Sequence, residues 1–364
     1  MRDLRKSLAL LVGAVLVAAC QSAAPTQAPL TPVELQLQWE PQAQFAGYFA
    51  ADKEGYYAAE GLDVEILRGG AEIIPQVVGS DPNGPEFTIS WVPKVLEVRA
   101  NGQSDLVDIA QIFQRSGTRS VSWVDSNIES PADFAGKNVG VWAFGNEYEV
   151  TAAGLKEGLV ENEDYTKVIQ PFNMDLLLNR EIDVAEAMIY NEYAQVLEAE
   201  NPDTGELYQP SDLNVIDYNA VGTAMLQDAI FARQAWLAQA GNEEIAVKFL
   251  RASFKGWMFC RDNPAKCIEY TVAAGSTLPA GHQRWMMNEI NPLIWPSPNG
   301  IGQLPMDTYN QTISIAKDAL IIPGDPDPAA VRTDLAERAR VGITGDMNGA
   351  NFQKGTVEVT AGGN

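Results

Sequence analysis

The stretch from Val33 to Leu67, VELQLQWEPQAQFAGYFAADKEGYYAAEGLDVEIL, predicts a strand, a helix and a second strand in succession. Apolar and polar residues alternate over residues 33–40, which is the two-residue period of a strand with one buried face. The apolar spacing then predicts a helix over residues 42–57, and Glu60-Gly61 turns the chain into a strand over residues 62–67. This order predicts a parallel βαβ unit.

Four side chains lie around the turn that joins the first strand to the helix: Trp39, Gln44, Phe45 and Tyr48. Ligands of open α/β sheets bind beyond the carboxyl ends of the strands. We therefore expect these four residues to face a binding site.

The run AGYFAADKEGYYAAEGLDVEI, residues 46–66, resembles the opening of the NMT1/THI5-like substrate-binding proteins of ABC importers, and the resemblance extends to about Pro323. Members of this family take up thiamine-pyrimidine precursors, riboflavin, taurine, alkanesulfonates and related small molecules. The resemblance implies an α/β protein of the periplasmic-binding-protein type II fold, with two Rossmann-like lobes joined by a two-segment hinge. It also implies a protein that binds without catalysis or cofactor.

The first twenty residues have the pattern of an export signal. Arg2, Arg5 and Lys6 precede an apolar run over residues 8–17, and Val17-Ala18-Ala19-Cys20 follows. We expect a signal peptide over residues 1–19, with Cys20 lipidated on the outer face of a bacterial cytoplasmic membrane. The alternative is a plain secretory signal with an incidental cysteine. The apolar run is too short to span a bilayer.

The length of the chain predicts two lobes, because about 300 folded residues exceed what one core usually holds. The expected division is a signal peptide over 1–19, a lipidated tether over 20–32, lobe 1 over 33–122 and 223–323, lobe 2 over 123–222, and a C-terminal tail over 324–364 with frayed last residues.

The chain is strongly acidic. It has 25 Lys and Arg against 48 Asp and Glu, a net charge of −23, and removal of the signal peptide takes away a net +2 and leaves −25. This charge argues against nucleic acid, which needs a basic surface, and disfavours multiply anionic ligands. A neutral or weakly cationic ligand fits better, although acidity alone can simply favour solubility.

Cysteine and histidine are scarce. With Cys20 assigned to the lipid, Cys260 and Cys267 remain, and in an exported protein they are expected to form a disulfide. The one histidine, His282, rules out a histidine-based metal cluster, so we expect no metal site. We predict that His282 is a surface or helix residue.

Two further strand ends carry candidate ligand contacts. Ser90 and Trp91 end the strand EFTISW and form a candidate ligand wall; the alternative for Trp91 is a place in the lobe interface. The run SPADFAGKNVGVW, residues 130–142, resembles the family's entry into the second lobe. Beyond it, we expect a helix over 143–159 whose free backbone N–H groups grip a polar ligand atom.

In that second turn, Trp142 and Phe144 offer flat walls, and Gly145 lets the backbone approach beside Asn146. The alternative is a plain strand-to-helix turn whose aromatic residues face the core.

The segment Tyr190-Asn191-Glu192 follows another predicted strand and resembles the vitamin-binding branch of the family. An amide beside a carboxylate can read the donor and acceptor edge of a heterocycle. The alternative role of Asn191 is to cap the helix over 192–199.

Several tryptophans at strand ends favour a flat, conjugated ligand. Riboflavin is the leading hypothesis, because the resemblance is closest to the riboflavin-binding branch and a tricyclic ring needs more aromatic wall than one pyrimidine. A formylaminopyrimidine-type thiamine precursor is second, with Glu192 pairing with its amino group. An aliphatic sulfonate held at Arg68-Gly69-Gly70 is third.

The same resemblance sets the expected partners: ABC permease and ATPase subunits, with the binding protein itself a monomer. Fungal relatives of this fold are enzymes that depend on an active-site histidine and a cysteine-rich motif. No cysteine cluster is present and His282 lies late in the chain, so we expect no enzyme activity.

Overall fold

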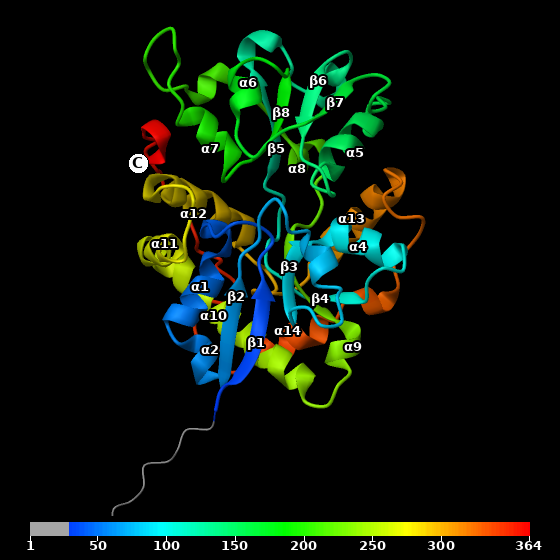
Figure 1. The fold of residues 1–364 in the computed structure, drawn as a ribbon, viewed down its shortest axis with the longest axis vertical. Helices are drawn as coiled ribbons and strands as arrows, with labels where there is room; N and C mark the ends of the chain where they lie inside the picture. The colour runs from blue at the N-terminus through cyan, green and yellow to red at the C-terminus, as the bar shows by residue number, and fades with distance from the viewer. Residues whose placement is uncertain (1–28) are drawn as a thin grey trace, which may run out of the picture.

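The computed structural model describes residues 29–364, which form two lobes, one above the other in Figure 1. The predicted signal peptide and Cys20 lie outside the described residues. The predicted tether over 20–32 is wrong at its end, because Thr31 and Pro32 already belong to strand β1 (Thr31–Gln36), where they pair with the strand over Leu62–Leu67. No helix within residues 29–364 is both long and apolar enough to cross a membrane.

Lobe 1 is built on a five-stranded sheet in the order β2-β1-β3-β10-β4. As predicted for the βαβ unit, β1 is parallel to β2 and to β3, whereas β10 is antiparallel to β3 and β4. The strands after β1 are β2 (Leu62–Leu67), β3 (Phe87–Trp91), β4 (Leu106–Gln111) and β10 (Asp228–Arg233).

Lobe 2 repeats this arrangement with the order β7-β6-β8-β5-β9, and β5 is antiparallel to β8 and β9. In each sheet the antiparallel strand is the one that arrives directly from the other lobe. The two sheets confirm the predicted two-lobed α/β fold. The strands are β5 (Thr118–Trp123), β6 (Asn138–Val141), β7 (Thr166–Ile169), β8 (Val184–Met188) and β9 (Leu213–Asp217).

Helices cover both faces of each sheet. In lobe 1, α1, α10, α11 and α12 gather on one side and α4 and α13 on the other (Figure 1). The α-helices are α1 (Ala46–Lys53), α2 (Tyr56–Ala59), α3 (Pro75–Val78), α4 (Val92–Ala100), α5 (Tyr148–Lys156), α6 (Asp175–Leu178), α7 (Glu192–Leu197), α8 (Tyr218–Val221), α9 (Gln234–Leu237), α10 (Asn242–Asp262), α11 (Pro264–Ala273), α12 (Ala280–Ile294), α13 (Met306–Asp318) and α14 (Thr333–Arg340). The 3-10 turns are η1 (Ala43–Phe45), η2 (Val124–Ser126), η3 (Pro131–Phe134), η4 (Pro210–Asp212), η5 (Pro328–Ala330) and η6 (Ala361–Gly363).

Two predicted helices differ from the structure. The helix expected over 42–57 is divided, because η1 runs directly into α1 and Gly55, in a left-handed conformation with φ of 72°, separates α1 from α2, which ends at Ala59. The helix over 143–159 begins only at Tyr148, so residues 143–147 form a turn. Close packing fixes α1: a side chain on Gly47 would overlap Trp257 of α10.

Two segments cross between the lobes, and they are linked through one buried carboxylate. The expected lobe boundary at residue 122 falls inside β5, so the first crossing lies just before Thr118 and the return lies just before β10. Glu149 of α5 accepts from Ser116 Oγ at 2.7 Å and from the backbone N–H of Met225 at 2.9 Å. The two crossings are therefore held side by side.

The C-terminal residues are ordered against the protein, so the prediction of a frayed end is wrong. α14 packs on α10 and β4. Further on, the backbone N–H of Gly362 donates to the carbonyl of Glu198 in lobe 2 at 3.0 Å, and Gly363 is buried. These contacts offset the conformational entropy that is lost when the tail is ordered. The glycine-rich sequence of the tail does not predict this order.

Cys260 and Cys267 are bonded and join the end of α10 to α11. In the chain-entropy model a loop of this size stabilises the fold by about 2 kcal/mol. We expect reduction to lower the free energy of unfolding by that amount, measured by urea unfolding with and without reductant. The control is Cys260→Ala/Cys267→Ala, which should not respond to reductant. An unchanged midpoint after confirmed reduction contradicts the prediction.

Candidate ligand-binding site

A cavity of about 300 Å³ lies between the lobes. Its lining comes from the segments that follow the carboxyl ends of β1, β2 and β3 in lobe 1 and of β6, β7 and β8 in lobe 2. This is the position at which open α/β sheets bind ligands, and the volume is at the lower end of the range for small-molecule sites.

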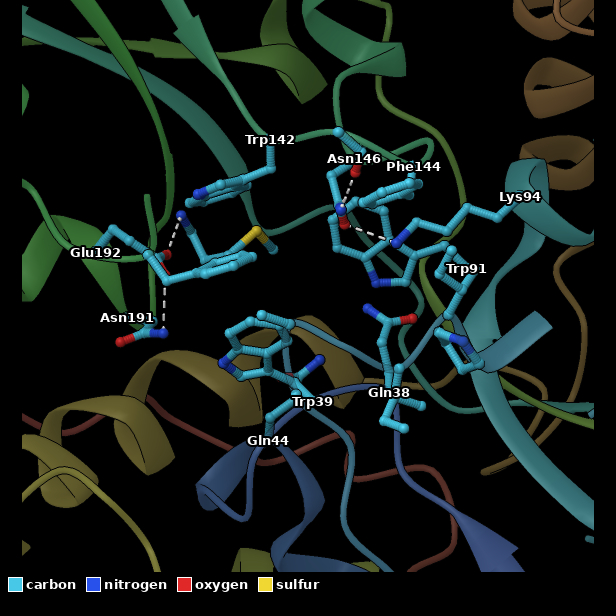
Figure 2. Close-up of a pocket in the computed structure, with 18 of the residues that line it drawn as sticks. Gln38, Trp39, Gln44, Trp91, Lys94, Trp142, Phe144, Asn146, Asn191 and Glu192 are labelled. Carbon is cyan, nitrogen blue, oxygen red and sulfur yellow. Dashed lines mark hydrogen bonds between the residues drawn. The ribbon is translucent and has the colours of Figure 1, made fainter. Parts of the chain in front are cut away.

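Nine of the thirteen residues predicted to contact ligand line this cavity: Trp39, Gln44, Trp91, Trp142, Phe144, Asn146, Tyr190, Asn191 and Glu192. Figure 2 shows Trp91, Lys94 and Gln38 at one end of the cavity and Asn191 and Glu192 at the other, with Trp39 and Trp142 between them.

The other four predicted residues do not line the cavity. Phe45 and Tyr48 are buried in the core of lobe 1, where Tyr48 packs edge-on against Trp257 at 5.6 Å between ring centroids. Ser90 is buried and donates to Gln76 Oε1 at 3.5 Å. The N–H of Gly145 donates to Glu147 Oε2 at 2.9 Å, so this turn does not leave that amide free.

The aromatic wall includes a ring that the sequence did not single out. Phe172, in the loop after β7, lies 4.0 Å from Trp39 and 6.2 Å from Trp142 between ring centroids, and it is nearly parallel to Trp142 with an interplanar angle of 14°. Phe172 therefore links a wall residue of lobe 1 to one of lobe 2. Its side chain and that of Phe144 are largely exposed.

Lys94 is a second lining residue that sequence reasoning missed. It sits in α4, is only 3% exposed, donates to Asn146 Oδ1 at 2.6 Å and lies 4.3 Å from the centre of the Trp91 ring. Burial lowers the pKa of Lys94 to about 8, against the opposing pull of Asp228, Glu147 and Glu186. A charged donor is thus placed at one end of the cavity.

Asp228 holds two residues that line the cavity, Gln44 and Trp91, in place. Its carboxylate accepts from Gln44 Nε2 at 2.9 Å and from Trp91 Nε1 at 2.8 Å. Burial raises the pKa of Asp228 to about 6, although these two hydrogen bonds act in the other direction. Gln44 and Trp91 are therefore oriented by a common partner that does not itself line the cavity.

Gln38 lines the cavity without a hydrogen-bond partner for its Oε1 atom among the described residues. The side chain is 8% exposed. Buried polar groups are normally paired, and an unpaired one calls for an explanation. A ligand hydrogen bond supplies one.

Asn191 and Glu192 occupy the opposite end. Asn191 Nδ2 donates to Glu192 Oε1 at 2.9 Å, and the N–H of Met188 donates to Glu192 Oε2 at 3.0 Å. Asn191 stands at the N-terminus of α7 but makes no side-chain capping bond, so the alternative role considered for it, capping this helix, is not observed. Burial raises the pKa of Glu192 to about 7.

The predicted anion site at Arg68-Gly69-Gly70 is not formed as expected. Arg68 is exposed and paired with Glu40, and of the three residues only Gly70 lines the cavity. Within residues 29–364, no group of three or more His, Cys, Asp or Glu side chains could hold a metal ion.

Two α/β lobes closed over a cavity at their strand ends define a substrate-binding protein of the type that serves ABC importers. Residues 42–267 match the NMT1/THI5 like family model, and the chain belongs to this family.

The chain is 26% identical over 269 residues to the formylaminopyrimidine-binding protein of Halalkalibacterium halodurans, covering 72% of this chain and 77% of the relative. It is also 26% identical over 275 residues to the riboflavin-binding protein RibY of Chloroflexus aurantiacus, covering 71% and 74%. The periplasmic aliphatic sulphonate binding protein SsuA of Escherichia coli shares the fold, with a TM-score of 0.59, 14% identity and coverage of 81% and 90%.

Buried carboxyl groups with raised pKa values predict that stability falls as pH rises. Burial raises the pKa to about 6 for Asp228, about 7 for Asp108 and Glu192, and about 8 for Glu149. Such a group stabilises the fold fully below its unfolded pKa, and this contribution is lost as pH rises through the folded pKa. We expect the melting temperature to fall between pH 5.5 and pH 8, measured by scanning calorimetry.

Asp108→Asn is the matched control for this pH dependence. Asp108 Oδ2 is buried without a hydrogen-bond partner among the described residues. A neutral amide at this position should therefore make the melting temperature fall less steeply near pH 7. The part of the pH dependence that comes from the other buried carboxyl groups should remain. A melting temperature that is constant or rises over this pH range contradicts the prediction.

Proposed function

We propose that this protein is an extracytoplasmic lipoprotein that captures a flat aromatic vitamin, riboflavin, between its lobes and delivers it to an ABC permease and ATPase. The observation that carries the proposal is the wall of Trp39, Phe172 and Trp142, in which rings from both lobes meet at the cavity. Rings arranged in this way favour a conjugated, planar ligand, and each stacking contact contributes about 1 kcal/mol beyond burial.

The polar groups at the two ends suit a heterocycle with carbonyl and N–H groups along one edge. Lys94 can donate to a ring carbonyl, and the unpaired amide of Gln38 can both donate and accept. The isoalloxazine ring of riboflavin carries two carbonyls and an N–H on one edge. Asn191 and Glu192 are then available to the hydroxyl groups of the ribityl chain.

A formylaminopyrimidine is the second candidate. Glu192 is a carboxyl that can accept from a ring amino group, and one relative is named as a formylaminopyrimidine-binding protein. A single pyrimidine would cover less of the aromatic wall. An aliphatic sulfonate is the third candidate. Among the described lining residues Lys94 is the one cation, and it already lies near the carboxyl groups of Asp228, Glu147 and Glu186, which reduces its attraction for an anion.

The remaining parts of the proposal concern the whole protein. It binds its ligand as a monomer and catalyses no reaction. A lipid on Cys20 anchors it to the membrane through the segment that precedes β1, and lobe 1 and lobe 2 enclose the ligand between them. The relatives, which are named as binding proteins, support this role.

The test of the ligand is a titration of riboflavin with purified mature protein, followed by flavin fluorescence. We expect saturable quenching with a Kd below about 1 μM, corresponding to about 8 kcal/mol of binding free energy. Formylaminopyrimidine and an alkanesulfonate are titrated against the flavin as competitors. No quenching at micromolar protein, with a thermal shift by the pyrimidine instead, would transfer the proposal to the second candidate.

The aromatic wall has its own test. Trp39→Ala or Trp142→Ala should weaken riboflavin binding at least tenfold, about 1.4 kcal/mol, because each removes one stacking surface. Trp236→Ala is the control, since Trp236 is half-buried like Trp39 but packs on Phe87 and does not line the cavity. Wild-type affinity in both wall variants, with folding intact, would sink the stacking model.

A further inference from the structure

His282 is buried in the interface between the lobes, not placed on the surface. It belongs to α12 and is fully buried. Its Nδ1 atom lies 3.0 and 2.9 Å from the two carboxylate oxygens of Glu198, and its Nε2 atom lies 2.9 Å from Asn191 Oδ1. Both partners are in lobe 2, so one side chain of lobe 1 is hydrogen-bonded to two side chains of lobe 2.

The partners of Asn191 determine what His282 does. Asn191 Nδ2 donates to Glu192, and Asn191 Oδ1 also accepts from Gln195 Nε2 at 3.1 Å. The oxygen of the amide therefore faces His282, and the ring must donate to it. On its other side, the ring faces the carboxylate of Glu198. The ring therefore lies within hydrogen-bond distance of both side chains and holds Glu198 and Asn191 at a fixed separation.

The chain of bonds ends in the cavity. Glu198, His282, Asn191 and Glu192 follow one another, and the last two line the site. The neighbouring residue on α12 supports the other wall, because Gln283 Oε1 accepts from the N–H of Ala43 in the turn that follows β1. One turn of α12 thus contacts the site-forming segments of both lobes.

The C-terminal residues close over this chain of bonds. A Cβ atom on Gly363 would lie 2.8 Å from His282 Cβ and 3.0 Å from the carboxylate oxygens of Glu198, so only glycine fits there. Gly363 also has a φ of 72°. Farther back, Lys354 pairs with Glu289 of α12 at 2.5 Å. In Figure 1 the C-terminus lies beside α12 and α7.

We propose that His282 is a positioning residue of the ligand site. It holds the Asn191–Glu192 pair in place from across the lobe interface, so this polar end of the site is complete only when the lobes are closed. The C-terminal residues around Gly363 keep His282 and Glu198 together. This inference rests on the proposed function only in needing a ligand in the cavity.

Two substitutions separate the two bonds of the ring. The amide nitrogen of glutamine can take the place of Nε2, and that of asparagine the place of Nδ1. His282→Gln keeps the donor to Asn191, whereas His282→Asn keeps the donor to Glu198. We expect His282→Asn to weaken riboflavin binding at least tenfold and to speed its release in stopped-flow fluorescence. His282→Gln should stay within about threefold of wild type, since about 0.65 kcal/mol corresponds to that factor.

A readout without ligand keeps the test independent of the proposed function. The side-chain amide of Asn191, assigned in a ¹⁵N spectrum with Asn191→Asp, should move in His282→Asn and stay close to its wild-type position in His282→Gln. If riboflavin fails to bind wild type, the proposed function falls while this spectrum still decides the role of His282. Equal effects of the two substitutions on both readouts would overturn the positioning role and leave His282 a merely structural residue.

The C-terminal contact is tested by Gly363→Ala, which places a methyl group against His282 and Glu198. We expect the same direction as for His282→Asn: faster riboflavin release and a shifted Asn191 signal. Gly102→Ala is the matched control, because Gly102 has a similar φ of 70° and a Cβ there meets nothing within 4 Å. Unchanged release and an unchanged signal in Gly363→Ala would remove the C-terminal residues from the proposal.

Discussion

The site depends on how the two segments that cross between the lobes are held together: the carboxylate of Glu149 bonds both of them, and Gln227 of the second segment bonds Gly117 and Thr118 of the first. The lining residues come from segments that follow the strands of both sheets, so the shape of the site depends on how the two sheets are placed. Burial raises the pKa of Glu149 to about 8, while its hydrogen bonds and Arg119 pull in the opposite direction. A buried carboxyl tolerated at such a cost indicates that the alignment of the crossings has a structural role.

The net charge of the chain describes its surface better than its cavity. Asp228, Glu192 and Glu186 lie at or just behind the cavity, and burial raises the pKa of each, which favours the protonated form in the interior. Lys94 adds a cation to the same region. The local field is therefore less negative than the net charge of −23 suggests.

The sequence predicts what depends on local pattern and on the end of a strand. Alternation over residues 33–40 and the run EFTISW place Trp39 and Trp91 at strand ends, and the structure puts both in the cavity. It does not predict burial that arises from tertiary contacts. The sequence analysis does not single out Lys94, a buried residue of α4, or Phe172, which belongs to a loop, and it expects at the site Phe45, which is buried in the core of lobe 1. His282 has no local signal at all, since its partners come from residues 191 and 198, far away in sequence.

A ligand can close the lobes only as far as it binds the closed form better than the open one. Trp39 belongs to lobe 1, whereas Trp142 and Phe172 belong to lobe 2, and Trp39 contacts Phe172 directly, so the aromatic wall is assembled only when the lobes are together. The direct contacts between the lobes are unequal. On one side two polar bonds join α4 to lobe 2, because Lys94 donates to Asn146 and Tyr148 donates to Glu97. On the other side the buried His282, the bond from Trp285 Nε1 to the carbonyl of Ile189, and the C-terminal residues contact lobe 2 together. The closed arrangement is therefore stabilised by polar bonds from α4 on one side and by α12 with the C-terminal residues on the other, and a ligand in the cavity adds to both by contacting residues of the two lobes at once.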